Sequence, residues 1–242
     1  MAALTPTDDD AAAVPSSRAP RQGLWPLLVV HAGLFAGGAV VLSLDPPAQG
    51  WGVLVVVAAY VVALLLTTRA TGRASGGADL HALAGFLVLV SLFQVLPDWV
   101  LADVVGTLAF PDRGGPRFDD VIPLAMMLMW VAPLFIALSL SGGSAARAAL
   151  LAGLVFAGAE VLAPTLGLWE PVGDTTRLVV VAVYVVPAEV ALGCAAATAF
   201  ALVRHRPLAV RAGAALAVST FYLGALVLAH FVIDVADCTV TT

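Results

Sequence analysis

The sequence predicts an all-α membrane protein: a seven-transmembrane-helix bundle with its N-terminus cytoplasmic and its C-terminus outside. Composition is the first observation, since 61% of the 242 residues are hydrophobic and only 11% are charged. A soluble domain has about a quarter of its residues charged. The second observation is a series of long apolar runs, and the third is the placement of the arginines between them. Together they predict a multi-pass protein of the cell membrane.

Seven apolar runs are long enough, or nearly so, to cross a bilayer. A spanning helix needs about 20 apolar residues, with some tolerance for tilt. Only helices satisfy their own backbone hydrogen bonds in lipid at this length. The expected helices cover residues 24–44, 51–67, 80–97, 121–140, 146–163, 178–203 and 208–233.

The chain divides into a tail, a membrane domain and a second short tail. Residues 1–23 are rich in Ala, Pro, Asp and Ser and predict a disordered cytoplasmic tail, residues 24–235 form the seven-helix domain, and residues 236–242 form a short outer tail. Positive residues in short loops favour the cytoplasmic side. With the N-terminus inside, eight of the eleven arginines are cytoplasmic: Arg18, Arg21, Arg69, Arg73, Arg147, Arg204, Arg206 and Arg211.

Two longer connections, residues 98–120 and 164–177, are then expected on the outer side. Residues 100–110 are amphipathic and apolar enough to lie at the membrane interface. No internal repeat is apparent in the sequence. An odd number of helices also argues against two equal inverted halves, which are common in transporters.

Several familiar chemistries are absent from the sequence. The two cysteines, Cys194 and Cys238, follow no metal-ligand spacing, so neither a metal nor another cofactor is predicted. There is no glycine-rich phosphate loop and no His-Glu-x-x-His motif. There is also no Asp-Asp-x-x-Asp motif to hold magnesium and diphosphate, which disfavours prenyl transfer and diphosphate ionisation. No basic cluster suggests nucleic acid. The sequence contains no lysine that could hold retinal. These absences leave proton-initiated or proton-coupled chemistry as the hypothesis for this protein.

Three carboxylic acids are the candidate catalytic residues. Glu160 lies thirteen residues beyond Arg147, about 20 Å along the helix, and Glu189 lies about 18 Å from Arg177. Asp98 ends the third expected helix. If these helices touch, the three acids converge on one zone in the outer half of the membrane.

A carboxyl group in the membrane interior is costly, by about 3 kcal/mol on insertion scales, and is a functional candidate by default. An acid kept protonated in a dry pocket can donate or relay a proton. The alternative is structural. Pro187, expected to interrupt the sixth helix, would leave a backbone carbonyl to which protonated Glu189 could donate a hydrogen bond.

Four aromatic residues are candidates for the substrate pocket: Trp130, Tyr184, Trp99 and Trp169. Their ring faces could stabilise a cation. Trp130 and Tyr184 lie deep in the expected helices. Trp99 and Trp169 lie where interfacial aromatic belts also place such residues.

Three short motifs carry a resemblance to known proteins: Pro-Asp-Trp at residues 97–99, Phe-Pro-Asp at residues 110–112 and Pro-x-Glu at residues 187–189. With them, the chain resembles a family of small seven-helix membrane proteins of haloarchaea and actinomycetes. That resemblance implies no activity. In helix count, size and placement of acids the layout is also similar to the integral-membrane terpene cyclases of meroterpenoid pathways. Those enzymes protonate an epoxide or alkene without metal.

The leading functional hypothesis is therefore a membrane-embedded isoprenoid (terpene) cyclase or hydratase acting on a lipophilic prenylated substrate. Glu189 would donate the proton, Glu160 would assist it or take the final proton, and Asp98 would orient them. Membrane lipid surrounds the site, and a prenyltransferase or epoxidase would be the pathway partner. One alternative is a proton-coupled carrier or lipid transporter, in which Glu160 and Glu189 bind protons. Another is a non-catalytic membrane subunit.

Overall fold

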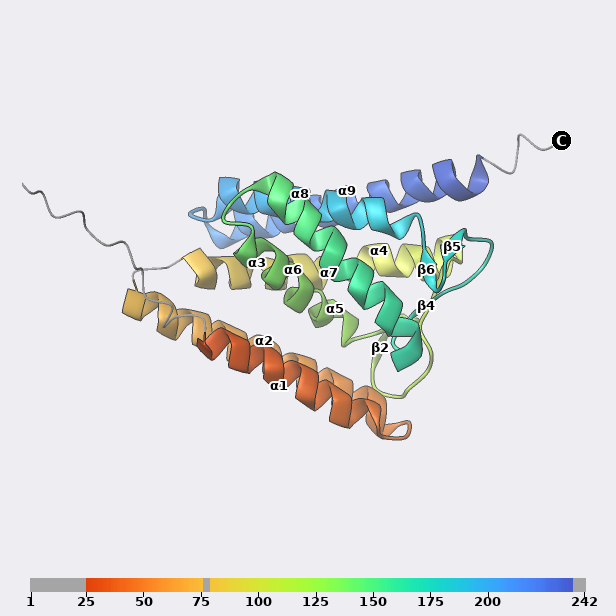
Figure 1. The fold of residues 1–242 in the computed structure, drawn as a ribbon, viewed down its shortest axis with the longest axis horizontal. Coiled ribbons are helices and arrows are strands. Elements are labelled where there is room, and N and C mark those ends of the chain that lie inside the picture. Colours follow the sequence, from red (N-terminus) through yellow and green to blue (C-terminus); the bar gives the residue numbers. More distant parts are fainter. Residues whose placement is uncertain (1–24, 76–78, 237–242) are drawn as a thin grey trace, which may run out of the picture.

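The computed structural model describes residues 25–75 and 79–236 and consists mostly of helices (Figure 1). The predicted tail 1–23 and residues 237–242 of the predicted outer tail lie outside the described residues. The helices are α1 Trp25–Leu42, α2 Ala48–Ser75, α3 Asp79–Phe93, α4 Val95–Trp99, α5 Met126–Met129, α6 Val131–Leu140, α7 Ala145–Leu166, α8 Val185–Val203 and α9 Leu208–His230. Two π-helical turns, η2 Val100–Val105 and η3 Phe231–Val235, extend α4 and α9.

Among the described residues, six helical segments are long and apolar enough to cross a membrane, which confirms the class that composition predicts. They are Trp25–Leu42, Ala48–Gly72, Asp79–Val105, Ala145–Leu166, Val185–Val203 and Leu208–Val235. The third segment is longer than expected, because helix continues through the region predicted to lie at the interface. The fourth expected helix is a shorter apolar segment, Met126–Leu140.

Six two-residue strands gather at one end of the bundle, here called the strand end, where Figure 1 labels β2, β4, β5 and β6. Three antiparallel pairs form. They are β1 Leu108–Ala109 with β4 Glu170–Pro171, β2 Arg117–Phe118 with β3 Ile122–Pro123, and β5 Arg177–Leu178 with β6 Val181–Ala182. The prediction that the sixth helix begins at residue 178 is therefore wrong. Residues 177–182 form a hairpin, whose turn holds Val179 in the left-handed region (φ 62°).

The order of elements is repeated, contrary to the expectation of no repeat. Residues 79–140 form a long helix, a single strand, a hairpin and a second helix, and residues 145–203 form the same series. The single strands of the two units, β1 and β4, pair antiparallel with each other. Such a pairing is expected for two copies of one unit related by a two-fold rotation. Because both units begin with a helix running toward the strand end, the repeat is parallel rather than inverted.

Prolines interrupt two of the helices. Pro97 has no N–H to donate to the carbonyl four residues earlier, and the helix breaks at Gln94, between α3 and α4. Pro133 acts in the same way on Met129, and the break between α5 and α6 falls at Trp130. Each break lies within four residues of its proline.

Pro187 does not interrupt a helix, contrary to expectation. It is the third residue of α8, in the first turn, where the backbone N–H has no partner within the helix. Helix α8 then continues without a break to Val203. No carbonyl is freed there for Glu189.

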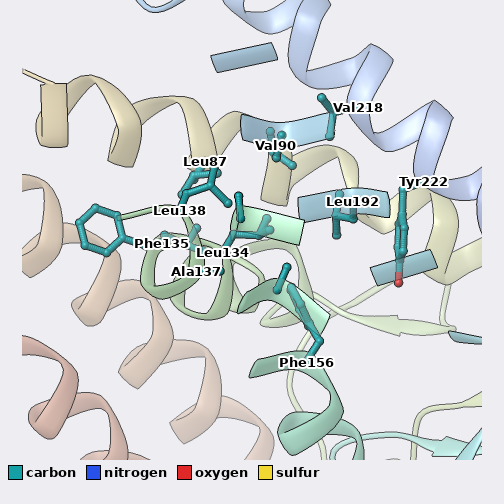
Figure 2. Close-up of a cluster of buried hydrophobic side chains, with 14 of the residues drawn as sticks. Leu87, Val90, Leu134, Phe135, Ala137, Leu138, Phe156, Leu192, Val218 and Tyr222 are labelled. Carbon is teal, nitrogen blue, oxygen red and sulfur yellow. The ribbon is translucent and has the colours of Figure 1, made fainter. Parts of the chain in front are cut away.

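The main hydrophobic core lies where α3, α6, α7, α8 and α9 meet. Figure 2 shows side chains from several of these helices converging, among them Leu87, Leu134, Phe156, Leu192 and Tyr222. All five are buried. Helices α1 and α2 pack against each other at the side of this core, and α1 contributes only Leu27 and Val41 as buried residues.

Helices α7 and α8 approach closely through small residues. A Cβ atom added to Gly193 would lie 2.7 Å from the carbonyl oxygen of Ala148, and one added to Gly153 would lie 2.6 Å from Val190 Cγ2. Small residues at helix contacts let backbones approach in membranes. This contact fixes the positions of Glu160 and Glu189, which lie on these two helices.

We expect Gly193→Val to destabilise the protein, because its side chain would displace the backbone of α7. Overfilling a well-packed contact costs about 1–3 kcal/mol, and a lowered Tm in detergent micelles would show it. Gly224→Val is the matched control, since an added Cβ at this helical glycine meets no atom within 4 Å. Equal Tm values for the two variants would contradict the close contact.

Candidate functional site

A small pocket of about 30 Å³ lies near the strand end, between the two repeated units and α9. Its polar lining groups come from five parts of the chain: Asp98, Thr107, Trp130, Glu160, Trp169, Tyr184 and Tyr222. The structure thus brings together two of the three predicted acids and three of the four predicted aromatic residues.

Asp98 and Trp130 form a pair inside the bundle. The Asp98 side chain is buried, and Trp130 Nε1–H donates a hydrogen bond of 3.2 Å to its Oδ2 atom. The Trp130 ring also contacts Phe156 and Tyr222, with ring centroids 5.0 and 5.5 Å apart. The helix break that Pro133 causes falls at Trp130, next to this hydrogen bond.

Glu160 has an indole donor as well. Helix α7 ends at Gly167, whose φ of 65° turns the chain back. Trp169 then lies against the helix, and its Nε1–H donates a 3.0 Å hydrogen bond to Glu160 Oε1. Only 8% of the Glu160 residue surface is exposed. The turn after α7 therefore provides the polar partner that this buried acid needs.

Glu189 is buried more deeply than the other two acids. Its exposure is 0%, and neither carboxyl oxygen has a hydrogen-bond partner among the described residues. It does not line the pocket, but it lies close enough to Glu160 and Tyr222 to interact with them electrostatically. A carboxyl group without a hydrogen-bond partner is far easier to bury when it carries a proton.

The repeat relates these side chains to one another. Asp98 and Glu160 each lie ten residues before the first residue of the paired strands, Leu108 and Glu170. Trp130 and Glu189 each lie eight residues after the start of the second hairpin strand, β3 or β6. In the first unit, Trp130 donates its hydrogen bond to Asp98. In the second unit, Glu189 takes the position of Trp130 and lies beside Glu160. A carboxyl group at this position can donate a hydrogen bond only when it is protonated.

Tyr184 and the end of α9 form a second polar group beside the pocket. The Tyr184 hydroxyl donates a 2.9 Å hydrogen bond to Thr107 Oγ1, and its ring contacts His230 edge to face. His230 Nδ1 lies 3.0 Å from Asp234 Oδ2, and Asp234 also accepts a hydrogen bond from the Thr176 N–H. These contacts fasten the end of α9 to the second unit.

Trp99 lies apart from the pocket. Its Nε1–H donates a 2.9 Å hydrogen bond to Asp119 Oδ2, in the turn of the β2–β3 hairpin, and its ring packs against the smaller hydrophobic cluster around Phe110 and Ile122. Trp169, the other tryptophan typical of an interfacial belt, does line the pocket.

Two central residues escaped the sequence reasoning. Tyr222 is 2% exposed and lines the pocket, and Gln94 is fully buried, with no partner for its amide among the described residues. A signal was present in both cases. Each is a polar side chain within a long apolar run, and Gln94 precedes Asp98 by one helical turn.

The three acids are not neutralised by basic side chains. Among the described residues, none of Asp98, Glu160 and Glu189 forms an ion pair with an arginine or histidine. In the same part of the chain, no group of three His, Cys, Asp or Glu side chains could hold a metal ion. The arrangement can hold, donate or accept protons next to aromatic rings.

A larger apolar cleft adjoins the pocket. Its volume is about 370 Å³, and side chains of α1, α2, α6 and α7 form its walls. Four residues line both spaces: Met126, Trp130, Glu160 and Trp169. They form the partition between the apolar cleft and the polar pocket, and Glu160 is the only carboxylic acid of the three that both spaces share.

The fold and site together define a helical, multi-pass membrane protein with carboxylic acids in its interior. The chain belongs to the family described as "Domain of unknown function (DUF6989)", which matches residues 95–233, more than half of its length. This region contains all three acids and every pocket-lining residue, whereas α1 and α2 precede it. No curated protein and no solved structure matches the chain.

We expect Trp130→Phe to lower the stability of the protein, because Asp98 would lose its donor while staying buried. Leaving a buried polar group unsatisfied costs about 1–3 kcal/mol, measurable as a lower Tm in lipid nanodiscs. Trp51→Phe removes the same atoms from an exposed side chain and should have little effect. Equal Tm values for the two variants would show that the indole N–H does not stabilise Asp98.

Proposed function

We propose that this protein is an isoprenoid (terpene) cyclase or hydratase of the cell membrane, which protonates a lipophilic prenylated substrate without a metal ion. The observation that carries the proposal is the group of three buried acids, which have no basic partner within residues 25–75 and 79–236, beside Trp130, Tyr184 and Tyr222. A dry site strengthens electrostatic interactions and excludes water from reactive intermediates. Aromatic ring faces stabilise positive charge.

The proposed reaction begins with transfer of a proton to an epoxide oxygen or a terminal alkene of the substrate. The resulting carbocation is attacked by the π electrons of another double bond of the same molecule, which closes a ring. Loss of a proton from carbon to a carboxylate then gives an isomer of the substrate. If the cation captures water instead, the protonated alcohol loses its proton to the carboxylate and the product is a hydrate. Proton transfer of this kind contributes about 10²–10⁴-fold to a rate.

The repeat supports a division of roles between the acids. Glu189 stores and supplies the proton, since it occupies the position from which Trp130 donates in the other unit. Glu160 belongs to the partition and interacts electrostatically with Glu189, so it passes the proton on or takes the final one. Asp98 holds Trp130 in place and orients the site. The layout resemblance to integral-membrane terpene cyclases agrees with this proposal, although no residue role is taken from it.

We also propose seven membrane crossings, with the strand end outside. Met126–Leu140 is short for a crossing. However, the preceding segment, Asp79–Val105, ends at the strand end, and the following segment, Ala145–Leu166, begins at the opposite end of the bundle. Of the nine arginines in residues 25–236, six lie at the end opposite the strands. Arginine-rich ends favour the cytoplasm, which supports a cytoplasmic N-terminus and an outer C-terminus.

A proton-coupled carrier is the second candidate, and the repeat favours it. Parallel repeats related by an axis along the membrane normal occur in several transporters. Helix α8 continues past Pro187 without a break, so it lacks the helix interruption that transporter sites often use. The size of the space among the acids also argues against it, because about 30 Å³ holds little more than one water molecule.

The test is a comparison of products in a host fed prenylated and epoxidised isoprenoids. We expect the wild type to yield an isomer or hydrate by mass spectrometry, and Glu160→Gln and Glu189→Gln to lower its yield about 100-fold or more. Glu170→Gln makes the same chemical change at an exposed residue outside the pocket and should leave the yield unchanged.

Immunoblots of membrane fractions establish that all variants are present in equal amounts. Wild-type yield from both glutamine variants would exclude acid catalysis by these residues. Absence of product with every substrate, together with proton-dependent uptake of solute into vesicles, would favour the carrier.

A further inference from the structure

The apolar cleft has the size and position of a ligand site. Its volume of about 370 Å³ lies within the range of small-molecule pockets. Along α7 it extends from Val155 to Leu166, about 16 Å at 1.5 Å per residue. Leu34 and Phe35 of α1 form the facing wall, and Pro133 and Ile136 of α6 also line it.

The cleft opens to the side of the bundle rather than to one end. Leu162 and Phe35 line it and are 56% and 67% exposed, on helices apolar enough to span a membrane. In a bilayer, such exposed apolar residues face lipid chains. A hydrophobic molecule dissolved in the membrane can therefore reach the cleft without passing through water.

The wall that α1 and α2 provide is held in place. His31 Nδ1 lies 2.8 Å from the Leu27 carbonyl oxygen, so this nitrogen donates, and Tyr60 then donates its hydroxyl proton to His31 Nε2 at 3.1 Å. Tyr60 also lines the cleft. This hydrogen bond joins the two helices that form the α1 and α2 walls of the cleft.

The charges of the cleft-lining residues limit which class of ligand the cleft can bind. Glu160 is the only ionisable carboxylic acid among the lining residues, and the cleft has no arginine, lysine or histidine in its wall. A phosphate or carboxylate headgroup would find no cationic partner there and would meet an acid. A neutral hydrocarbon end is suited to the site, with the aromatic faces of Trp130, Phe156 and Trp169 around it.

We propose that the cleft between α1 and α7 binds the hydrocarbon chain of a neutral isoprenoid, which arrives from the bilayer and places its end against Glu160. This inference rests on the proposed function and names the binding site of its substrate. The small polar pocket, lined by Asp98, Tyr184 and Tyr222 among others, then contains no part of the chain. Met126, Trp130 and Trp169 separate the chain from this pocket.

The test uses purified full-length protein in lipid nanodiscs and a geranylgeranyl alcohol that carries a photoactivatable diazirine. We expect cross-links, mapped by mass spectrometry, on α1, α6 and α7 at cleft residues. Excess unlabelled geranylgeraniol should compete, whereas excess phosphatidylglycerol should not. Gly158 lines the cleft and has no atom within 4 Å of an added Cβ, so Gly158→Phe should fill the cleft. Labelling should fall about tenfold, because the chain loses apolar contact area.

Gly224→Phe is the matched control, an exposed helical glycine with equally open surroundings but outside the cleft. Leu162→Trp fills the same cleft from an exposed position. Its labelling provides a second test if Gly158→Phe does not fold. Labelling spread evenly over all lipid-facing helices, unchanged in the filled variants or displaced equally by phosphatidylglycerol, would overturn the inference.

Cross-linking requires no turnover, so this test is independent of the proposed catalysis. Specific labelling without any product from the fed isoprenoids would support the binding site but contradict the proposed cyclase activity. Unchanged product formation by both Gly158→Phe and Leu162→Trp would support the cyclase activity but contradict substrate binding in this cleft.

Discussion

The rest of the site depends on one constraint: three carboxylic acids lie in an apolar bundle, and no basic side chain in the described part of the chain neutralises them. Each acid is costly to bury and needs either a donor or a proton of its own. Trp130 and Trp169 provide donors for Asp98 and Glu160. Glu189 has no such donor in the part of the chain that the structure describes. The helix break at Trp130 and the turn at Gly167 are local features that bring the two indoles to the acids.

The membrane class and the key side chains could be predicted from the sequence, because burial in lipid requires long apolar runs in which any acid is conspicuous. Asp98, Glu160 and Glu189 were identified in this way, whereas Trp130, Trp169 and Tyr184 were identified as aromatic rings that could stabilise a cation. Helix boundaries were harder to predict from the sequence. The run after residue 178 is apolar throughout, and only a hairpin turn with Val179 at positive φ separates strand from helix there.

The repeat could not be predicted, because its two units share geometry rather than residue types. An aspartate in one unit corresponds to a glutamate in the other, and Trp130 corresponds to Glu189. Pairing of β1 with β4 shows the relation, and residues so far apart in sequence give no local signal of it. Trp99 illustrates the opposite difficulty. It was predicted to line the pocket because its ring could stabilise a cation, but its indole N–H donates to Asp119 in the β2–β3 turn.

Two adjoining spaces of different character connect the structure with the proposed chemistry. One is polar and barely larger than a water molecule, and the other is apolar and large enough for a ligand. Glu160 lines both, so it is the group through which a proton from the interior would reach a hydrophobic chain. A carrier would need a polar path of comparable size to its solute, and the polar space is too small to hold one.

The central claim is that Glu189 carries a proton inside the bundle at neutral pH. The most direct measurement is infrared spectroscopy of the protein in lipid nanodiscs, comparing wild type, Glu189→Gln and Glu170→Gln. The account predicts a carbonyl stretch of a protonated carboxylic acid that disappears in Glu189→Gln and persists in Glu170→Gln. A wild-type spectrum with only carboxylate bands, or a protonated band unchanged by Glu189→Gln, would contradict it.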